Sequence, residues 1–284
     1  MLNFSQRIGK KPASKELQIE SMDKDLKNGL WNVVKKFIIL DNPYFQNSYI
    51  ITYHDFGVLF NFFWKDYLKK TIDTAPTDLS EQNYKIKYYF FKGEWNEVFD
   101  IIEFIAQNFR LRNFVDEVNE ILEKEFSAYR FIDDIIAPIS NTSEVEEIDN
   151  AIVTTNRFTA LEGANIHLKD ALTFLSDREK PHYRNSIKES ISAVEATANA
   201  IAGTSKDTLG KALSKLKNKI NLHPALELGF KQIYGYTSDA DGIRHFLMED
   251  SKCDFEDAKY MLVSCSAFIN YLIVKAQKAG IQIK

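Results

Sequence analysis

The feature that most constrains this chain is a pair of apolar stripes in its C-terminal half. Between residues 183 and 201 the apolar residues recur in steps of four, three, four and three, at Ile187, Ile191, Val194, Ala198 and Ile201. Residues 254–278 repeat the pattern over more turns, at Ala258, Met261, Leu262, Cys265, Phe268, Ile269 and Leu272. Such spacing keeps one face of a helix apolar. Long helices with short connections predict an antiparallel helical bundle.

The rest of the chain is also mainly helical in pattern. We expect further helices at about 19–40, 54–72, 95–109, 114–126, 158–175, 208–220 and 225–234. Residues 85–91 fit either a strand or a helix. Two β-prone runs, 129–132 and 135–138, flank Asp133-Asp134 and predict a hairpin. The expected fold class is therefore mainly α, with an N-terminal α domain that contains a small β-hairpin and a C-terminal antiparallel helical bundle.

A polar segment near the middle of the chain predicts a domain boundary. Ser140-Asn-Thr-Ser143 precedes an acidic stretch, which is typical of a linker that enters a helix. We therefore expect domains at 1–140 and 157–284, with 141–156 as linker or helix. Residues 1–150 carry 18 Lys and Arg against 25 Asp and Glu, whereas residues 151–284 carry 18 against 15. A mildly basic C-terminal half suggests nucleic-acid binding, although ordinary variation in surface charge explains it equally.

Charged and titratable side chains are most concentrated in the segment Tyr234–Phe246. It gathers Asp239, Asp241, Arg244 and His245 within seven positions, next to Gly242. Two acids, a fixed cation and an imidazole in one loop are the groups that acid–base catalysis uses. The alternative is a structural connector, with Asp241-Gly242 as a turn.

A lysine row and one acid are further candidates. Lys211, Lys215 and Lys219 recur every fourth residue, opposite an apolar face, and such a row can follow a phosphate backbone or simply be a solvated face. Glu195 lies at the edge of an apolar stripe, where a partly buried carboxylate needs a partner, and Arg244 or His245 is the expected one. Glu189 and Asn199 are expected to be solvated. Asp207 or Ser205 is expected to cap the next helix.

Several classes of function lack their sequence signals. Cys253 and Cys265 match no metal-ligand spacing, and His54, His167, His182 and His223 have no acidic or histidine partner at ligand spacing, so neither a metal nor a cofactor is expected. Glycine-rich phosphate loops and nucleophile elbows are missing from the sequence. The N-terminus lacks a signal-peptide core, and the longest apolar run, 56–64, is too short to span a membrane. We therefore expect a cytoplasmic protein without membrane contact.

Four short stretches together resemble a known family. Phe4-Ser-Gln-Arg-Ile-Gly9 and Leu30-Trp-Asn32 are similar to the start of the N-terminal domain, class 4, of AbiJ-type abortive-infection proteins. Ile187-Lys-Glu-Ser-Ile-Ser-Ala-Val-Glu195 and Tyr236-Thr-Ser-Asp-Ala-Asp-Gly-Ile-Arg-His245 resemble their C-terminal half, a HEPN-like helical domain. The resemblance covers nearly the whole chain.

The resemblance implies an anti-phage protein and a metal-independent endoribonuclease that acts as a homodimer through the C-terminal domain. His245 is then expected to move a proton, Arg244 to stabilise charge on the phosphate, and Asp239, Asp241 or Glu195 to orient them. RNA is the expected partner, and residues 1–140 are expected to sense a phage-derived trigger.

This sequence departs from the usual HEPN signature of an arginine, four to six residues, and a histidine. Ser238, Asp239 and Ala240 occupy the arginine positions, and Arg244 is adjacent to His245. The alternative is therefore a catalytically inactive HEPN-like module that binds RNA or a protein.

Overall fold

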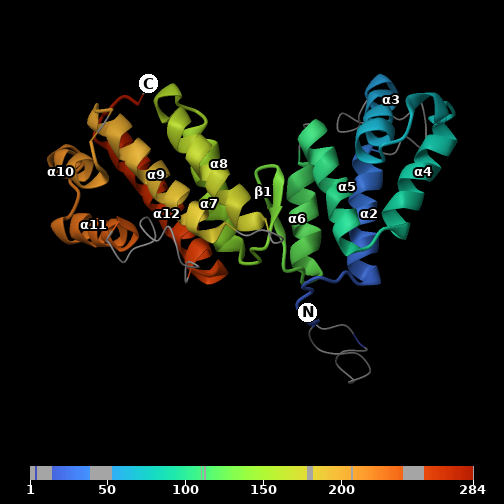
Figure 1. The fold of residues 1–284 in the computed structure, drawn as a ribbon, viewed down its shortest axis with the longest axis horizontal. Coiled ribbons are helices and arrows are strands. Elements are labelled where there is room, and N and C mark those ends of the chain that lie inside the picture. Colours follow the sequence, from blue (N-terminus) through green and yellow to red (C-terminus); the bar gives the residue numbers. More distant parts are fainter. Residues whose placement is uncertain are drawn as a thin grey trace, which may run out of the picture. The chain divides into compact units, whose positions relative to one another are not determined.

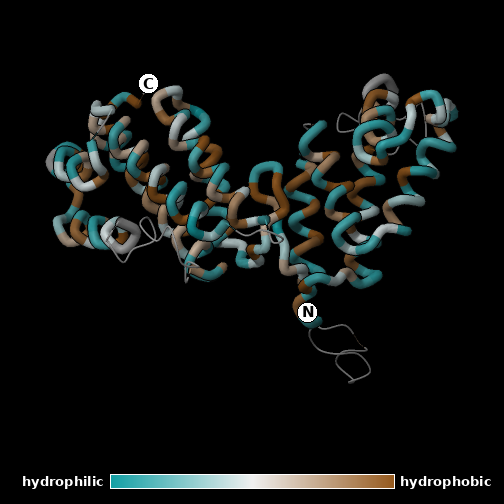
Figure 2. The backbone as a smooth tube through the Cα atoms, viewed as in Figure 1, coloured by the Kyte–Doolittle hydropathy of each residue, from teal (hydrophilic) through white to brown (hydrophobic). Residues whose placement is uncertain are grey.

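The computed structural model describes residues 15–38, 53–109, 111, 113–177, 182–205, 207–238 and 253–283, together with Phe4; for 53–55, 218 and 236–238 it describes only the backbone. The chain divides into two compact units, Met1–Ser140 and Asn141–Lys284. Within the described parts of the chain, eleven α-helices and one two-stranded antiparallel sheet make a mainly helical protein, which confirms the expected fold class (Figure 1). Figure 2 shows apolar and polar residues alternating along the helices.

The N-terminal unit packs its helices around an aromatic core. Its elements are α2 (Lys24–Ile38), α3 (Tyr53–Phe62), the π-helical turn η1 (Phe63–Tyr67), the 3-10 turn η2 (Ile72–Thr74), α4 (Leu79–Lys92), α5 (Trp95–Asn108), α6 (Phe114–Lys124), β1 (Arg130–Ile132) and β2 (Ile135–Ala137). The expected hairpin is confirmed, with Phe131 opposite Ile136 and Asp133 at a φ of 55° in its turn. The ambiguous residues 85–91 belong to α4.

Two helices of this unit are shorter than their periodicity predicts. The helix expected from residue 19 begins at Lys24, because Asp23 accepts a hydrogen bond from the Leu26 amide (2.7 Å) and so caps it. The helix expected to reach residue 72 widens into a π-turn and ends at Tyr67. Lys69 then takes a φ of 53°, and the Trp64 indole donates to the Thr71 carbonyl (3.1 Å). A capped start and a left-handed residue override the apolar pattern in these two places.

The C-terminal unit consists of helices packed along one another. Its elements are α7 (Thr142–Thr155), the 3-10 turn η3 (Thr159–Leu161), α8 (Glu162–Ser176), α9 (Tyr183–Ala202), α10 (Leu209–Lys219), α11 (Pro224–Ser238) and α12 (Phe255–Lys278). Helix α9 packs between α8 and α12, and α7 packs against α12 and α8. Six residues join α8 to α9, so these two helices run antiparallel. Every residue of the two predicted apolar stripes is buried.

The segment 141–156 forms helix α7, which belongs to the C-terminal unit. Asn141 caps it by accepting from the Ser143 amide (3.0 Å). Glu147 accepts from the Asn270 side chain on α12 (2.9 Å), and the Ile152 carbonyl accepts from Asn165 on α8 (2.7 Å). These bonds tie α7 to two helices of the bundle.

Candidate functional site

The four residues of the Arg-His loop, Asp239, Asp241, Arg244 and His245, lie outside the described residues. Their chain segment joins α11, which ends at Ser238, to α12, which begins at Phe255. The roles predicted for these four residues therefore stay predictions.

Glu195, the fifth predicted catalytic residue, is partly buried on α9 and holds the start of α10. One of its carboxylate oxygens accepts from the backbone amide of Leu209 (3.1 Å). It thus satisfies one of the unpaired amides at that helix end. From the sequence, Asp207 or Ser205 is the residue expected to cap the start of α10. This was wrong, because α10 is capped from the neighbouring helix and Asp207 is paired elsewhere.

Asn199 organises the turn between α9 and α10. The side chain is only 8% exposed, which corrects the expectation that it is solvated. Its amide nitrogen donates to the carbonyls of Glu195 (3.0 Å) and Asp207 (2.8 Å). Its oxygen accepts from the Thr204 hydroxyl (2.7 Å) and from the Asp207 amide (3.2 Å). A buried amide with all these bonds made fixes the turn rigidly.

The lysine row is exposed on α10, opposite the buried Leu209, Leu213, Leu216 and Ile220. Lys215 pairs with Asp207 (2.5 Å), and Lys219 donates to the Ala202 carbonyl (3.0 Å). The hydrogen bond from Lys215, together with the charge of Lys211, holds the pKa of Asp207 below its usual value. One of the three positive charges is thus balanced within the protein, and Lys211 and Lys219 have no ion pair among the described residues.

A second polar group links α10 to α11. Glu227 is buried and accepts from Lys231 (2.5 Å) and Ser214 (3.0 Å), while Lys217 lies 3.5 Å away. These contacts, the hydrogen bond from Lys231 above all, lower the pKa of Glu227. Sequence analysis missed this group, although the spacing of four between Glu227 and Lys231 on one helix was a signal for it.

His167 on α8 pairs with Glu189 on α9. The His167 Nδ1 lies 2.6 Å from a Glu189 carboxylate oxygen, and the Glu189 side chain is 14% exposed. The expectation that Glu189 is solvated is therefore wrong. Ligand spacing along the sequence could not reveal the pair, because its members come from different helices.

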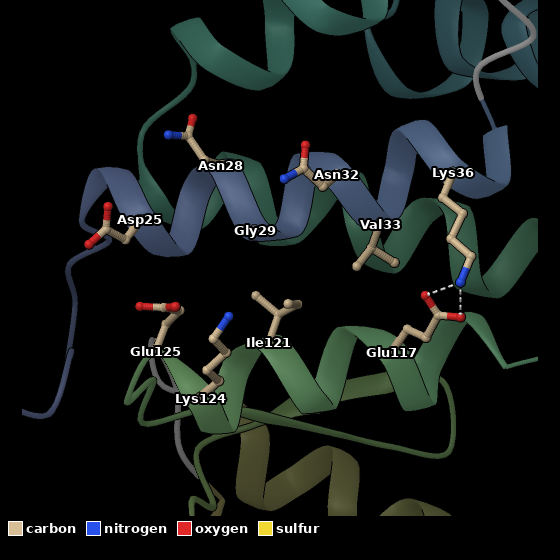
Figure 3. A pocket seen from close by; sticks show the side chains of 10 residues that line it. All are labelled: Asp25, Asn28, Gly29, Asn32, Val33, Lys36, Glu117, Ile121, Lys124 and Glu125. Carbon is tan, nitrogen blue, oxygen red and sulfur yellow. Dashed lines mark hydrogen bonds and ion pairs between the residues drawn. The ribbon is translucent and has the colours of Figure 1, made fainter. Parts of the chain in front are cut away.

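A groove of about 430 Å³ lies between α2 and α6 in the N-terminal unit (Figure 3). Gly29 is required there, since a Cβ at this position would lie 2.7 Å from the Ile121 side chain. At one end Lys36 pairs with Glu117 (2.6 Å), and at the other Lys15 binds both Asp25 and Glu125. Because four of the five charged residues that line the groove are already held in ion pairs, the groove carries no functional assignment.

Counting charge by structural unit changes its interpretation. The unit 141–284 carries 18 Lys and Arg against 19 Asp and Glu, a net charge of −1, because the acidic helix α7 belongs to it. The basic character of the C-terminal half is therefore local to α10. The described residues contain no group of three or more His, Cys, Asp or Glu side chains placed to hold a metal ion. None of the described helices is both long enough and apolar enough to cross a membrane.

Fold and polar groups together define a helical protein of two units. Comparison with protein families matches residues 2–154 to the family described as AbiJ N-terminal domain 4. The chain belongs to this family, and the domain marks it as an abortive-infection protein of anti-phage defence. The matched segment spans the N-terminal unit and nearly all of α7. No curated protein and no solved structure gives a match.

Proposed function

We propose that this abortive-infection protein is an effector that cuts RNA with Arg244 and His245 of its C-terminal unit. The supporting observation is that an AbiJ N-terminal domain is joined to a second, separately packed helical unit, whose sequence places these two residues between α11 and α12. The N-terminal unit then senses a phage-derived trigger and restrains the C-terminal unit until infection.

The proposed chemistry needs no metal. His245 takes the proton from a ribose 2′-hydroxyl, whose oxygen attacks the adjacent phosphorus. The bond from phosphorus to the 5′ oxygen breaks as the protonated His245 returns the proton to that oxygen. The products are a 2′,3′-cyclic phosphate and a 5′-hydroxyl. Arg244 stabilises the extra negative charge on the phosphate in the transition state. Asp239 and Asp241 orient these groups rather than touch RNA, since carboxylates repel phosphate.

Glu195 acts in this scheme as a positioning residue. It fixes the start of α10 through the Leu209 amide, and α10 carries Lys211, Lys215 and Lys219 toward solvent. The row binds the RNA backbone, with Lys211 and Lys219 as the stronger contributors because Lys215 is already paired with Asp207. Two copies of the chain associate through the C-terminal unit, so that two Arg-His pairs face one strand.

The test is induction of the His245→Ala variant beside the wild type and His182→Ala in phage-infected cells, where the restraint by the N-terminal unit is released. His182 is an exposed histidine of the same unit and serves as the matched control. We expect the wild type and the control to arrest growth and to cut RNA into fragments with cyclic phosphate ends, also in the presence of a chelator. The His245→Ala variant should do neither, with unchanged circular dichroism. Full cleavage by that variant would exclude His245 as the acid or base.

A second function, an inactive module that binds RNA or a protein, is favoured by one sequence observation. Arg244 is adjacent to His245 instead of four to six residues before it. On a helix, adjacent side chains diverge by about 100°, so the pair can reach one phosphate only from an irregular backbone. Intact RNA after induction during phage infection, together with RNA retained on the purified protein, would support this function and exclude the nuclease.

A further inference from the structure

Helix α4 of the N-terminal unit exposes a row of aromatic side chains. Tyr84, Tyr88 and Phe91 are 61%, 41% and 37% exposed. Their spacing of four and three places them on one face of the helix. The rings of Tyr84 and Tyr88 are stacked, with centroids 6.2 Å apart. We call these three residues the aromatic ridge. Ile86 and Phe90 on the opposite face are buried. Tyr84 and Tyr88 are exposed, whereas Phe91 lies at the edge of the core, with its ring 5.6 Å from that of the buried Trp31.

Lysines flank the aromatic ridge on both sides. With about 100° of rotation per residue, Lys87 lies about 60° to one side of Tyr84, and Lys85 and Lys92 lie about 80–100° to the other. The Lys92 ammonium is 5.4 Å from the centre of the Tyr88 ring. Helix α4 carries these three lysines against a single acid, Glu81.

A fourth cation strengthens one end of the ridge. Lys27 on α2 donates to the carbonyls of Gly93 (2.6 Å) and Phe91 (3.1 Å), which brings its charge to the C-terminal end of α4. The N-terminal unit is acidic as a whole, with 18 Lys and Arg against 21 Asp and Glu. The positive charge beside the aromatic ridge is therefore a local concentration and not a property of the unit.

We propose that the aromatic ridge is a binding surface for single-stranded nucleic acid. Bases stack on exposed rings whatever their identity, and lysines on both flanks contact the phosphates on either side. Helix α4 presents both the exposed rings and the flanking lysines. A protein partner would use the rings but would not account for cations on both flanks. The proposal goes beyond the RNA-cutting function, because it assigns nucleic-acid binding to the unit that lacks the Arg-His loop.

The test measures the binding of a fluorescent oligothymidylate of about 20 nucleotides, longer than common single-strand sites, to the full chain by anisotropy. This probe has no 2′-hydroxyl, so the proposed nuclease cannot cut it, and failure here is separate from failure of that function. Each ring lost should weaken binding by about fivefold to 150-fold. The variant Tyr84→Ala/Tyr88→Ala should therefore bind far more weakly than the wild type. The variant Tyr84→Phe/Tyr88→Phe keeps the rings and should bind like the wild type.

Two further variants separate the ridge from other surfaces. Tyr260 on α12 is 60% exposed, and Tyr260→Ala is the matched control that should leave affinity unchanged. Lys87→Glu/Lys92→Glu should lower affinity and reduce the slope of log affinity against log salt by about 0.7 per lysine. Undetectable binding by the wild type, or equal affinity of Tyr84→Ala/Tyr88→Ala and the wild type with folding intact, would overturn the proposal. So would loss of binding in a Lys211→Ala variant alone.

Discussion

The two units of this protein fill their helical cores with different kinds of side chain. The N-terminal core is built from rings, among them Trp31, Phe37, Phe56, Phe60, Phe63, Trp64, Phe90, Phe99 and Phe114. Many of these rings contact one another, as Phe60 does with both Phe63 and Trp64. The C-terminal core uses leucine, isoleucine and many alanines, including Ala164, Ala171, Ala193, Ala198, Ala212, Ala258 and Ala276. Small residues let helix backbones approach, whereas rings fill wider and less regular spaces.

Buried hydroxyl groups show how close the C-terminal helices lie. Ser186 on α9 is fully buried, and its hydroxyl donates to the Ala171 carbonyl of α8 (2.8 Å). Ser190 and Thr197 donate to carbonyls four residues earlier on α9 (2.8 and 2.9 Å). These bonds satisfy the hydroxyls without polar partners from other side chains. We therefore expect that truncating a buried side chain lowers stability most in the N-terminal unit. Enlarging a buried side chain should lower it most in the C-terminal unit.

The largest expected effect is the loss of a core ring. Phe60→Ala should lower the free energy of unfolding of the N-terminal unit by about 3–5 kcal/mol, because a buried ring leaves a cavity. All three tryptophans, at 31, 64 and 95, lie in this unit, so their fluorescence reports its unfolding in the full chain. Phe62→Ala on the same helix is the control, since Phe62 is 42% exposed. Equal costs for the two variants would contradict the cavity explanation.

Adding volume to the C-terminal unit should cost less but remain clear. Ala198→Leu places three extra carbons at a fully buried position of α9 and should lower stability by about 1–3 kcal/mol. Circular dichroism should show an earlier transition, while the tryptophan signal stays unchanged because this unit has no tryptophan. The partly buried Ala196 is the matched site, and Ala196→Leu should have little effect. If Ala198→Leu were neutral, the close packing inferred for this unit would be wrong.

A smaller effect is expected from the cap of α10. Glu195→Ala removes the acceptor for the Leu209 amide and should cost about 1 kcal/mol, the usual value of a helix cap. Glu195→Gln keeps an oxygen in the same place and should cost less. Hydrogen exchange of the amides at the start of α10 gives a local readout. Unchanged exchange at Leu209 in Glu195→Ala would show that the carboxylate does not hold this helix end.

The smallest effect concerns pH. Because Lys231 lowers the pKa of Glu227 from its usual 4.5, ionised Glu227 stabilises the folded C-terminal unit above that value. This contribution is lost as the pH falls through the lowered folded-state pKa. The melting temperature of Glu227→Gln should therefore depend less on pH below about 5 than that of the wild type. Glu146→Gln, on the exposed side of α7, is the control, and an equal flattening there would argue against the Glu227 contacts.

Sequence periodicity predicts the helices and their buried faces well. It predicts the contacts of the polar side chains less well. The prediction that residues such as Ile191 and Leu262 belong to the core is confirmed. It succeeds because an apolar stripe marks the one face of a helix that packs inward. The pattern predicts Glu195 as a partly buried acid but not its bond to the Leu209 amide, since no side-chain pattern marks a backbone group. The partner predicted for it, Arg244 or His245, stays a prediction. Glu189 and Asn199 were misjudged because their positions around α9 were weighed without α8 and the turn before α10.

What the sequence by itself determined is the helical character of the chain, the hairpin at Asp133-Asp134 and the two apolar stripes of the bundle. These follow from residues close together in the chain, whose spacing decides which face is buried. Only the tertiary structure decided that α7 belongs to the C-terminal unit, that Glu195 caps α10, and that His167 meets Glu189. Each of these contacts joins separate segments, and their encounter depends on how whole helices pack.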